Sequence, residues 1–406
     1  MDHHHALTQL AIILAAAFIG GAIFKKLKQP ALVGYIIVGI ILGSSVSGVV
    51  HEQENVSFMA ELGILLLLFL AAMELDLHNF KAVAKISITT CAVQIAVALI
   101  AMFAFGFFFD WSVNRCILMG FVVSLSSTAV ALKILDDSGL RATRIGEKSI
   151  GILISQDIAV IPMILFIGAT STSEGFNYMG IIKLVIALLL MGLIIFLFTK
   201  KPKFFSPIWR KFEKLHDFTM QGQTAVTGLA ICFTAAAIAG LLGLSAAYGA
   251  FLAGLVIGNT FSHKKLEAHT KPIFEVMIMI FFLSIGLLID LNFLKDHFVE
   301  IVFLLFITMF IKTIVNIVTL RLQGVEKNEA YVTGAVLGQV GEFGFILAAM
   351  GLSTNTIQEE GYKYVIAIIS LSLLATPLWL YMVKRFKILD QITFRRRKKS
   401  APDSLI

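Results

Sequence analysis

The two residues with the clearest chemical potential are Gln156 and Asp157, which interrupt an apolar run that starts at Gly151 and continues to about Ala169. Because a helix rises by about 1.5 Å per residue, a helix over this run can cross a bilayer. A carboxylate near the middle of such a helix costs roughly 2.5–3.5 kcal/mol on insertion scales. A charge in that position needs a partner or a function, so Asp157 is the first candidate for an ion-binding residue.

A second charge, Lys312, falls in another apolar run. It lies nine residues before Arg321, too deep in the expected span for its ammonium to reach the membrane surface comfortably. We expect the ammonium to face an internal carboxylate or the C-terminal end of a helix. Lys312 is then either a structural charge partner, which neutralises helix ends or pairs with Asp157 when no ion is bound, or a direct participant in proton exchange.

Two short stretches rich in serine or glycine are expected to break membrane helices near these charges. Such residues weaken a helix locally, and a broken helix offers dipole ends and free carbonyl groups that can bind a bare cation. The alternative is that small residues only allow close helix packing. Beside Gln156 and Asp157, the expected cation-binding residues are Ser124, Ser126, Ser127 and Thr128. The expected supporting residues are Gly338, Gln339, Gly341 and Glu342. Among these, Glu342 is placed to steady a helix end or a neighbouring polar group.

The composition favours a membrane protein. With 58% hydrophobic and 15% charged residues and a mean hydropathy of +0.89, it excludes an ordinary soluble domain and predicts an all-α integral membrane protein. The three cysteines have no paired spacing, so neither a disulfide nor a transition-metal site is expected. We find no nucleophile–base constellation and no glycine-rich phosphate motif, and therefore expect neither an enzyme nor a cofactor.

About thirteen apolar runs are candidate membrane spans. They begin near Leu7, Pro30, Ser57, Ile86, Val113, Gly146, Tyr178, Gln221, Leu244, Pro272, His297, Glu329 and Tyr362. Acidic residues such as Glu74, Asp76 and Asp290 lie at the expected span ends, where solvated capping is the simpler interpretation.

Basic residues collect in the loops after odd-numbered spans. Lys200, Lys201 and Lys203 follow the seventh span, for example, and Arg395–Lys399 follow the thirteenth. The positive-inside rule then places the N-terminus outside and the C-terminus in the cytoplasm. The same distribution explains the net charge of +7 without nucleic acid as a partner. The lipid bilayer is the expected partner, and the basic tail can contact its anionic headgroups.

The sequence repeats itself at a nearly constant separation, slightly more than half of its length. Matched pairs include Gly39 with Gly254, Asp76 with Asp290, Gly120 with Gly334, and Pro162 with Pro377. The members of each pair lie seven spans apart along the chain. Because the chain crosses the membrane once in each span, an odd number of spans reverses the direction in which the matched helix crosses. We therefore predict two inverted repeats of six helices with the span at 178–199 as connector. At the same separation Asp157 matches Ser372, and Lys312 matches Ala98. The two buried charges thus depart from the repeat.

Five ordered motifs resemble the membrane domain of Kef-type potassium/proton antiporters, which belong to the monovalent cation/proton antiporter-2 family. They are Leu65–Asp76, Leu125–Ala129, Gln156–Pro162, Gly249–Gly254 and Gly338–Phe343, and the resemblance covers about residues 6–385. It implies a sodium/proton antiporter-like fold of thirteen helices with broken helices crossing at the midplane, in the bacterial inner membrane. It also implies that Asp157 carries the ion and the proton, and that Lys312 is the membrane-embedded lysine of the family.

The resemblance further implies a homodimer in which a core moves like an elevator against a dimerisation domain. On this basis the chain divides into a dimerisation or scaffold part at 1–80, a core transport part at 81–175, a connector helix and basic cytoplasmic loop at 176–220, a second scaffold part at 221–296, a second core part at 297–385, and a basic cytoplasmic tail at 386–406.

The expected function is exchange of K⁺ for H⁺ at Asp157, where a proton and a cation compete for one carboxylate. A Na⁺/H⁺ antiporter of the same fold is the alternative. A K⁺ channel, or a pore subunit gated by a separate cytoplasmic partner, is the alternative from another class. Kef proteins continue into a nucleotide-binding regulatory domain, whereas this sequence ends about twenty residues after the last expected span. Control by glutathione or nucleotide would require further chain or a separate regulatory subunit.

Overall fold

The computed structural model describes residues 3–27, 30–43, 46–47, 53–75, 77–169, 178–200, 224–259 and 263–385. Several predictions made from the sequence lie outside these residues. They are the cap at Asp76, the start of a span at Gln221, the basic loop within 176–220 and the basic tail at 386–406.

The described residues form helices and connecting turns, with no strand among them. The helices are α1 (His3–Lys26), α2 (Ala31–Leu42), α3 (Gln53–Met73), α4 (Leu77–Phe108), α5 (Val113–Ser124), α6 (Thr128–Asp137), α7 (Arg144–Ala169), α8 (Tyr178–Lys200), α10 (Thr224–Leu241), α11 (Ala246–Gly258), α12 (His263–Leu287), α13 (Leu291–Asp296), α14 (Phe298–Leu322), α15 (Lys327–Val336), α16 (Phe343–Ser353) and α17 (Glu359–Arg385).

All thirteen spans expected from the sequence overlap a helix in this series. Within the part of the chain that the structure describes, four helical stretches are long and apolar enough to cross a membrane: Phe80–Phe108, Val113–Asp137, Arg144–Gly168 and Phe298–Leu322. Shorter apolar helices, such as Ala31–Leu42 and Ala246–Gly258, accompany them. The all-helical class is confirmed, whereas the number of membrane crossings stays a prediction.

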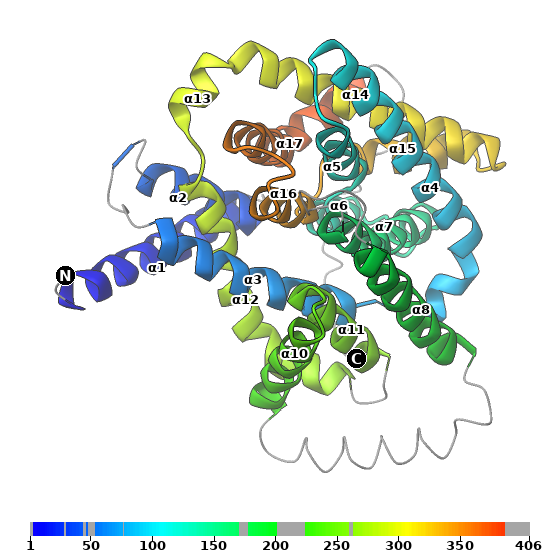
Figure 1. Cartoon of the computed structure of the whole chain (residues 1–406). Coiled ribbons are helices and arrows are strands. Elements are labelled where there is room, and N and C mark those ends of the chain that lie inside the picture. The colour runs from blue at the N-terminus through cyan, green and yellow to red at the C-terminus, as the bar shows by residue number, and fades with distance from the viewer. Residues whose placement is uncertain are drawn as a thin grey trace, which may run out of the picture.

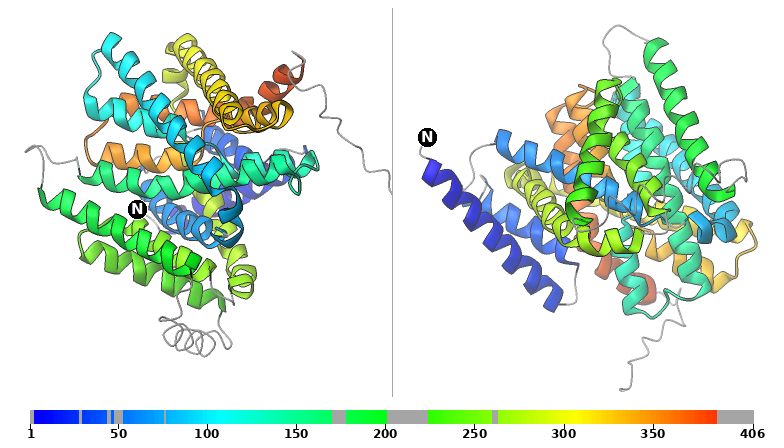
Figure 2. Two further views of the ribbon diagram at one scale, coloured as in Figure 1. Left: turned by 90° about the vertical axis from the view of Figure 1, so that its right-hand side faces the viewer. Right: turned by 90° about the horizontal axis from the view of Figure 1, so that it is seen from below.

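The outer surface of the molecule carries large apolar side chains. They are exposed along α1, α8, α10 and α14, and include Phe18, Leu189, Ile238 and Phe303. Figure 2 shows α1 at the edge of the molecule when it is seen from below. A soluble protein rarely exposes so continuous an apolar surface, whereas side chains of this kind suit contact with lipid acyl chains.

The helices pack in two groups (Figure 1). In one group α2, α3, α11 and α12 make the most extensive contacts, with α1 and α10 at its edges. In the other, α4 to α7 pack with α14 to α17. The long helix α8 touches α4 and α7 on one side and α11 on the other. The short helix α13 lies in the connection between α12 and α14, where the chain passes from one group to the other, at the outer edge of the molecule in Figure 1.

Glycines matched by the sequence repeat make matched helix contacts. A Cβ atom added to Gly39 of α2 would lie 2.7 Å from the Cα atom of Gly286 in α12. A Cβ atom added to Gly254 of α11 would meet the backbone carbonyl of Phe69 in α3. Small residues at such positions let membrane helices approach closely. Gly39 and Gly254, which match in the sequence repeat, thus each allow two helices to approach closely.

The two interruptions lie where the serine and glycine clusters predict them. The chain is extended between α5 and α6, at Leu125 to Ser127, and non-helical between Val336 and Phe343. The N–H of Gly341 donates to the carbonyl of Leu125 at 3.0 Å, and the hydroxyl of Ser126 donates to the carbonyl of Leu337 at 2.9 Å. The two broken helices therefore cross in direct backbone contact.

We predict that Gly341→Ala disrupts this crossing. A Cβ atom at Gly341 would lie 2.6 Å from the carbonyl oxygen of Ser126, so the backbone must move apart. The expected loss is about 1–3 kcal/mol of unfolding free energy, measured as a lower melting temperature in detergent. Gly168→Ala is the matched control, because its nearest contact is the end of the Met350 side chain at 3.9 Å. Equal melting temperatures for the two variants would contradict the crossing.

The connection between the two helix groups is fastened to α17. Asp290 caps α13 through Oδ1, which accepts hydrogen bonds from the N–H groups of Asn292 and Phe293 at 3.0 and 3.1 Å. Its Oδ2 accepts a hydrogen bond from Lys363 of α17 at 2.9 Å. The hydrogen bond from Lys363, followed by the backbone bonds, holds the pKa of Asp290 below its ordinary value of 3.8. The bridge therefore requires the ionised carboxylate.

The lowered pKa predicts a stability contribution that is present above pH 3.8 and lost as the pH falls through the folded-state pKa. Both side chains are about one-third exposed, so Asp290→Asn should cost about 0.2–1 kcal/mol at pH 7. Asparagine keeps the capping function, so the difference isolates the bridge to Lys363. Unfolding in detergent at pH 7 and at a pH below the folded-state pKa of Asp290 measures it, with exposed Asp296→Asn as control. A deficit of the same size at both pH values would contradict the bridge.

Candidate functional site

Asp157 lies on α7 against the beginning of α6. Its side chain is buried, with 4% of the residue exposed. The hydroxyl of Thr128, the first residue of α6, is 3.3 Å from both carboxylate oxygens and donates to them. The N-terminus of a helix carries roughly half a positive charge. The structure therefore places the carboxylate at a positive helix end with one long hydrogen bond.

Gln156, the neighbour of Asp157, holds the first interruption in place. Its Oε1 accepts from the N–H of Ser126 at 2.8 Å. Its Nε2 donates to Oε1 of Gln94 on α4 at 2.7 Å and to the carbonyl of Ser124 at 3.3 Å. Gln94 in turn donates to Asn316 on α14. This buried chain of amides ties α7, α5, α4 and α14 together.

Lys312 projects from α14 toward the ends of the two broken helices. Its ammonium donates to the carbonyl of Leu125, just after α5, and to the carbonyl of Gln339, after α15, the latter at 2.9 Å. Both are negative helix ends, where a cation is stabilising. Leu125 and Gln339 occupy matching positions in the two halves of the repeat. Among the ion pairs of the described residues, none joins Lys312 to Asp157.

The hydroxyl residues expected to bind a cation have different contacts. The hydroxyl of Ser124 donates to the carbonyl of Phe121 at 2.7 Å. The hydroxyl of Ser126 donates to the carbonyl of Leu337 in the second interruption. The hydroxyl of Ser127 caps α6 by accepting from the N–H of Val130 at 3.2 Å. Of these four residues, Thr128 is the one whose hydroxyl contacts Asp157, and the three serines shape the backbone around it.

The residues expected to play a supporting role gather at the crossing. Gln339 donates to the carbonyl of Ser127 at 3.2 Å, and Glu342 accepts from the N–H of Ala129 in α6 at 3.4 Å. A Cβ atom at Gly338 would lie 3.0 Å from Nε1 of Trp379. The glycine stretch thus approaches both α6 and α17.

Sequence reasoning missed three residues that support this arrangement. They are Gln94, Asn316 and Ser372, whose hydroxyl accepts from the N–H of Val340 at 3.2 Å. Each is a buried polar residue in an apolar run. That signal was present: Asn316 follows Lys312 by one helical turn, and Ser372 is the residue that matches Asp157 in the repeat.

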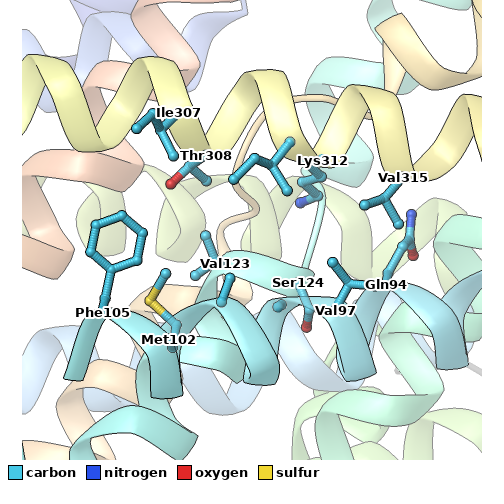
Figure 3. A pocket seen from close by; sticks show the side chains of 13 residues that line it. Gln94, Val97, Met102, Phe105, Val123, Ser124, Ile307, Thr308, Lys312 and Val315 are labelled. Carbon is cyan, nitrogen blue, oxygen red and sulfur yellow. The ribbon is translucent and has the colours of Figure 1, made fainter. Parts of the chain in front are cut away.

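A small cavity of about 40 Å³ opens between α4, α5 and α14 (Figure 3). Lys312, Ser124 and Gln94 line one part, while Met102 and Phe105 line another. Its volume is enough for a water molecule or two. The cavity therefore brings polar groups of the crossing next to a space in which water fits.

The oxygen atoms shown at this position are those of the Asp157 carboxylate and the hydroxyl of Thr128. Within the described part of the chain, no group of three or more His, Cys, Asp or Glu residues is arranged to hold a metal ion. Oxygen donors suit alkali-metal and hard divalent cations. A buried carboxylate with one hydroxyl partner can take up such a cation or a proton to offset its charge.

Comparison with known proteins agrees with this chemistry. The family of transmembrane sodium/hydrogen exchangers matches residues 13–383. A protein of Paramagnetospirillum magneticum named iron transporter MagA is 37% identical over 94% of this chain and 87% of its own length. The putative cation/proton antiporter YbaL of Escherichia coli is 29% identical over 94% of this chain and 70% of its own length. The K(+) efflux antiporter 5 of Arabidopsis thaliana is 27% identical over 92% and 65%, respectively.

A similar fold occurs in the sodium proton antiporter MjNhaP1 of Methanocaldococcus jannaschii at pH 8. The TM-score is 0.68 at 15% sequence identity, covering 96% of this chain and all of the other. This likeness shows the fold. Together with the family match it confirms an integral membrane protein, and the relatives confirm the Kef-type resemblance. The chain belongs to the sodium/hydrogen exchanger family and is a cation/proton antiporter of the Kef type.

Proposed function

We propose that this protein exchanges a monovalent cation, with K⁺ favoured, for H⁺ at Asp157. The observation that supports the proposal is the environment of this carboxylate. It is buried, and among the described residues its hydrogen-bond partner is the hydroxyl of Thr128 at 3.3 Å. A single long hydrogen bond does not compensate a buried charge. The carboxylate therefore needs a cation or a proton, and these compete for it.

This competition couples the two fluxes. Asp157 with either a cation or a proton bound is neutral, so the helices that carry it can cross the membrane. A bare carboxylate resists the same movement because of its desolvation cost. We assign direct contact with the cation to Asp157 and the oxygen of Thr128. Gln156 and the serines Ser124, Ser126 and Ser127 hold the interrupted backbone beside these two residues.

The movement we propose is an elevator-type displacement of one helix group against the other. Its support is that α4 to α7 pack mainly with α14 to α17 and touch the group around α2, α3, α11 and α12 less extensively. The first group corresponds to the expected core parts at 81–175 and 297–385, and the second to the scaffold parts. A homodimer in the bacterial inner membrane, with the N-terminus outside and the C-terminus cytoplasmic, completes the proposal.

The names of the relatives leave several cargoes to compare. One is named for K⁺ efflux and another for iron. Imidazole and thiolate ligands suit iron and other transition metals, whereas carboxylate and carbonyl oxygens suit harder cations. The oxygen donors near Asp157 therefore favour an alkali-metal ion, and K⁺ is preferred over Na⁺ here by analogy with the Kef type.

A channel, or a pore subunit silent without a cytoplasmic partner, is the rival class. A channel passes cations without a proton gradient, and a pore subunit shows no flux when the purified chain is reconstituted alone. Proton-coupled flux by the purified chain in proteoliposomes, compared for K⁺, Na⁺ and Li⁺ across pH, separates these classes.

We predict that Asp157→Asn abolishes exchange and leaves a folded protein. The amide keeps the shape of the side chain but cannot take up a proton or pair with a cation. A pH-sensitive dye inside proteoliposomes should report background rates for this variant after a K⁺ pulse. Asp137→Asn, which removes an exposed carboxylate that pairs with Lys133, should retain the wild-type rate. Cation-driven proton flux in the Asp157 variant would refute the proposed site.

The structural role of Lys312 has a separate test. Lys312→Met removes two charged hydrogen bonds, each worth about 1.5–3 kcal/mol, so we expect a clear fall in melting temperature. Exposed Lys295→Met is the control and should melt like the wild type. A Lys312 variant with wild-type stability but altered proton coupling would instead favour direct participation of this lysine in proton exchange.

A further inference from the structure

A hollow of about 510 Å³ lies between α8, α10 and α11. Figure 1 shows α10 and α8 on either side of α11, which touches both of them. The lining residues fall within Ile231–Leu242 and Leu244–Ile257, and α8 adds Leu190. This volume is in the range of small-molecule binding sites. None of the lining residues takes part in the crossing of the broken helices, so the hollow is separate from the exchange site.

The lining of the hollow is apolar. Among its residues Tyr248 has the one polar side-chain atom, and this hydroxyl donates to the carbonyl of Ala187 in α8 at 2.7 Å. A buried water needs two to four polar partners, so water is a poor occupant of this space. An empty apolar volume is destabilising in proportion to its size. The hollow therefore calls for an apolar occupant.

The hollow opens onto the apolar outer surface of the molecule. Leu190, Ile238 and Leu242 line it, and these residues are 43%, 53% and 64% exposed, respectively. Ala235 and Ala239 also line it, and their small side chains leave its depth free. In an integral membrane protein such a surface faces the hydrocarbon of the bilayer. Acyl chains are therefore the molecules that surround the opening.

The dimensions of the hollow suit a single slender chain. At 1.5 Å per residue, the lining from Ile231 to Leu242 is about 16 Å long. The hydrocarbon core of one leaflet is about 15 Å thick, half of the roughly 30 Å of a bilayer. A helix with its side chains is about 10–12 Å wide, so the volume of the hollow equals only about one turn of helix. An acyl chain fits this length and volume, whereas a membrane-spanning helix does not.

We propose that this hollow is a binding site for one acyl chain of a membrane phospholipid. The chain enters beside the turn between α10 and α11, which Leu242 and Leu244 border, and lies along Ala235 and Ala239. The turn from Leu241 to Ser245 holds no charged residue, so the site selects the hydrocarbon chain and not the headgroup. Because α8 also touches α4 and α7, the bound chain packs against a helix that contacts both helix groups.

The test is retention of phospholipid by the purified, delipidated chain. Phosphatidylglycerol or phosphatidylethanolamine is added back in mixed micelles. Native mass spectrometry should then show a phospholipid adduct on the wild type, and either lipid should raise its melting temperature. Ala235→Leu fills the hollow, so both effects should need at least tenfold more lipid. Ala237→Leu changes an exposed position of the same helix that does not line the hollow, and should respond like the wild type.

The length of the acyl chain provides a second measurement. Each buried methylene adds to the affinity, so dipalmitoyl phosphatidylglycerol should bind the wild type at least tenfold more tightly than the dioctanoyl lipid at equal mole fraction in the micelle. This difference should disappear in Ala235→Leu. Equal binding of the two lipids by the wild type, or a response to phosphatidylglycerol but not to phosphatidylethanolamine, would mean that the protein binds a headgroup, and the proposal would be wrong.

Two other occupancies predict different results, and either result overturns the proposal. Lipid held only in the general layer around the protein gives the same adduct on the wild type and on both variants. A second copy of the chain seated in the hollow gives a changed oligomeric state in Ala235→Leu without a change in lipid binding. If Ala235→Leu does not fold, Ala253→Leu fills the hollow from α11 and must show the same loss of lipid.

Discussion

The structure depends on one contact, the crossing of two interrupted helices. The hydrogen bond from Gly341 to the carbonyl of Leu125 joins the interruptions, and a side chain at Gly341 would not fit against Ser126. Because the chain is not helical there, its carbonyl and N–H groups are free to interact with side chains. Gln156, Lys312 and the carboxylates then act on backbone groups that an unbroken helix would keep to itself.

The crossing separates charges by sign. The ammonium of Lys312 lies where α5 and α15 end, and the carboxylates of Asp157 and Glu342 lie where α6 begins. Each charge thus faces a helix end of opposite sign, which lowers the cost of burying it. The arrangement offsets the lysine more fully than the carboxylates. That difference leaves the two carboxylates in need of a further counter-charge, as the proposed exchange at Asp157 requires.

Much of this site could be predicted from the sequence, because charges and helix-weakening residues are conspicuous in an apolar chain. Asp157, Lys312 and the two interruptions were all identified in this way. The partners of the hydroxyl groups could not be predicted. The hydroxyl of Ser126, for example, can donate a hydrogen bond to the backbone or bind an ion, and the distances that decide between these are not encoded in the composition. The amide chain from Gln156 to Asn316 was missed for a related reason. Polar residues on separate helices meet only after packing decides which faces touch.

The position of Lys312 has a consequence for how a duplicated chain of this kind can be built. The residue that matches it in the first half, Ala98, lines the same small cavity. A lysine there would bring a second ammonium to a pair of carbonyls that already share one, and the two like charges would repel each other in a buried space. Only one of these two matched positions can therefore hold a lysine, and the other has to stay small and neutral.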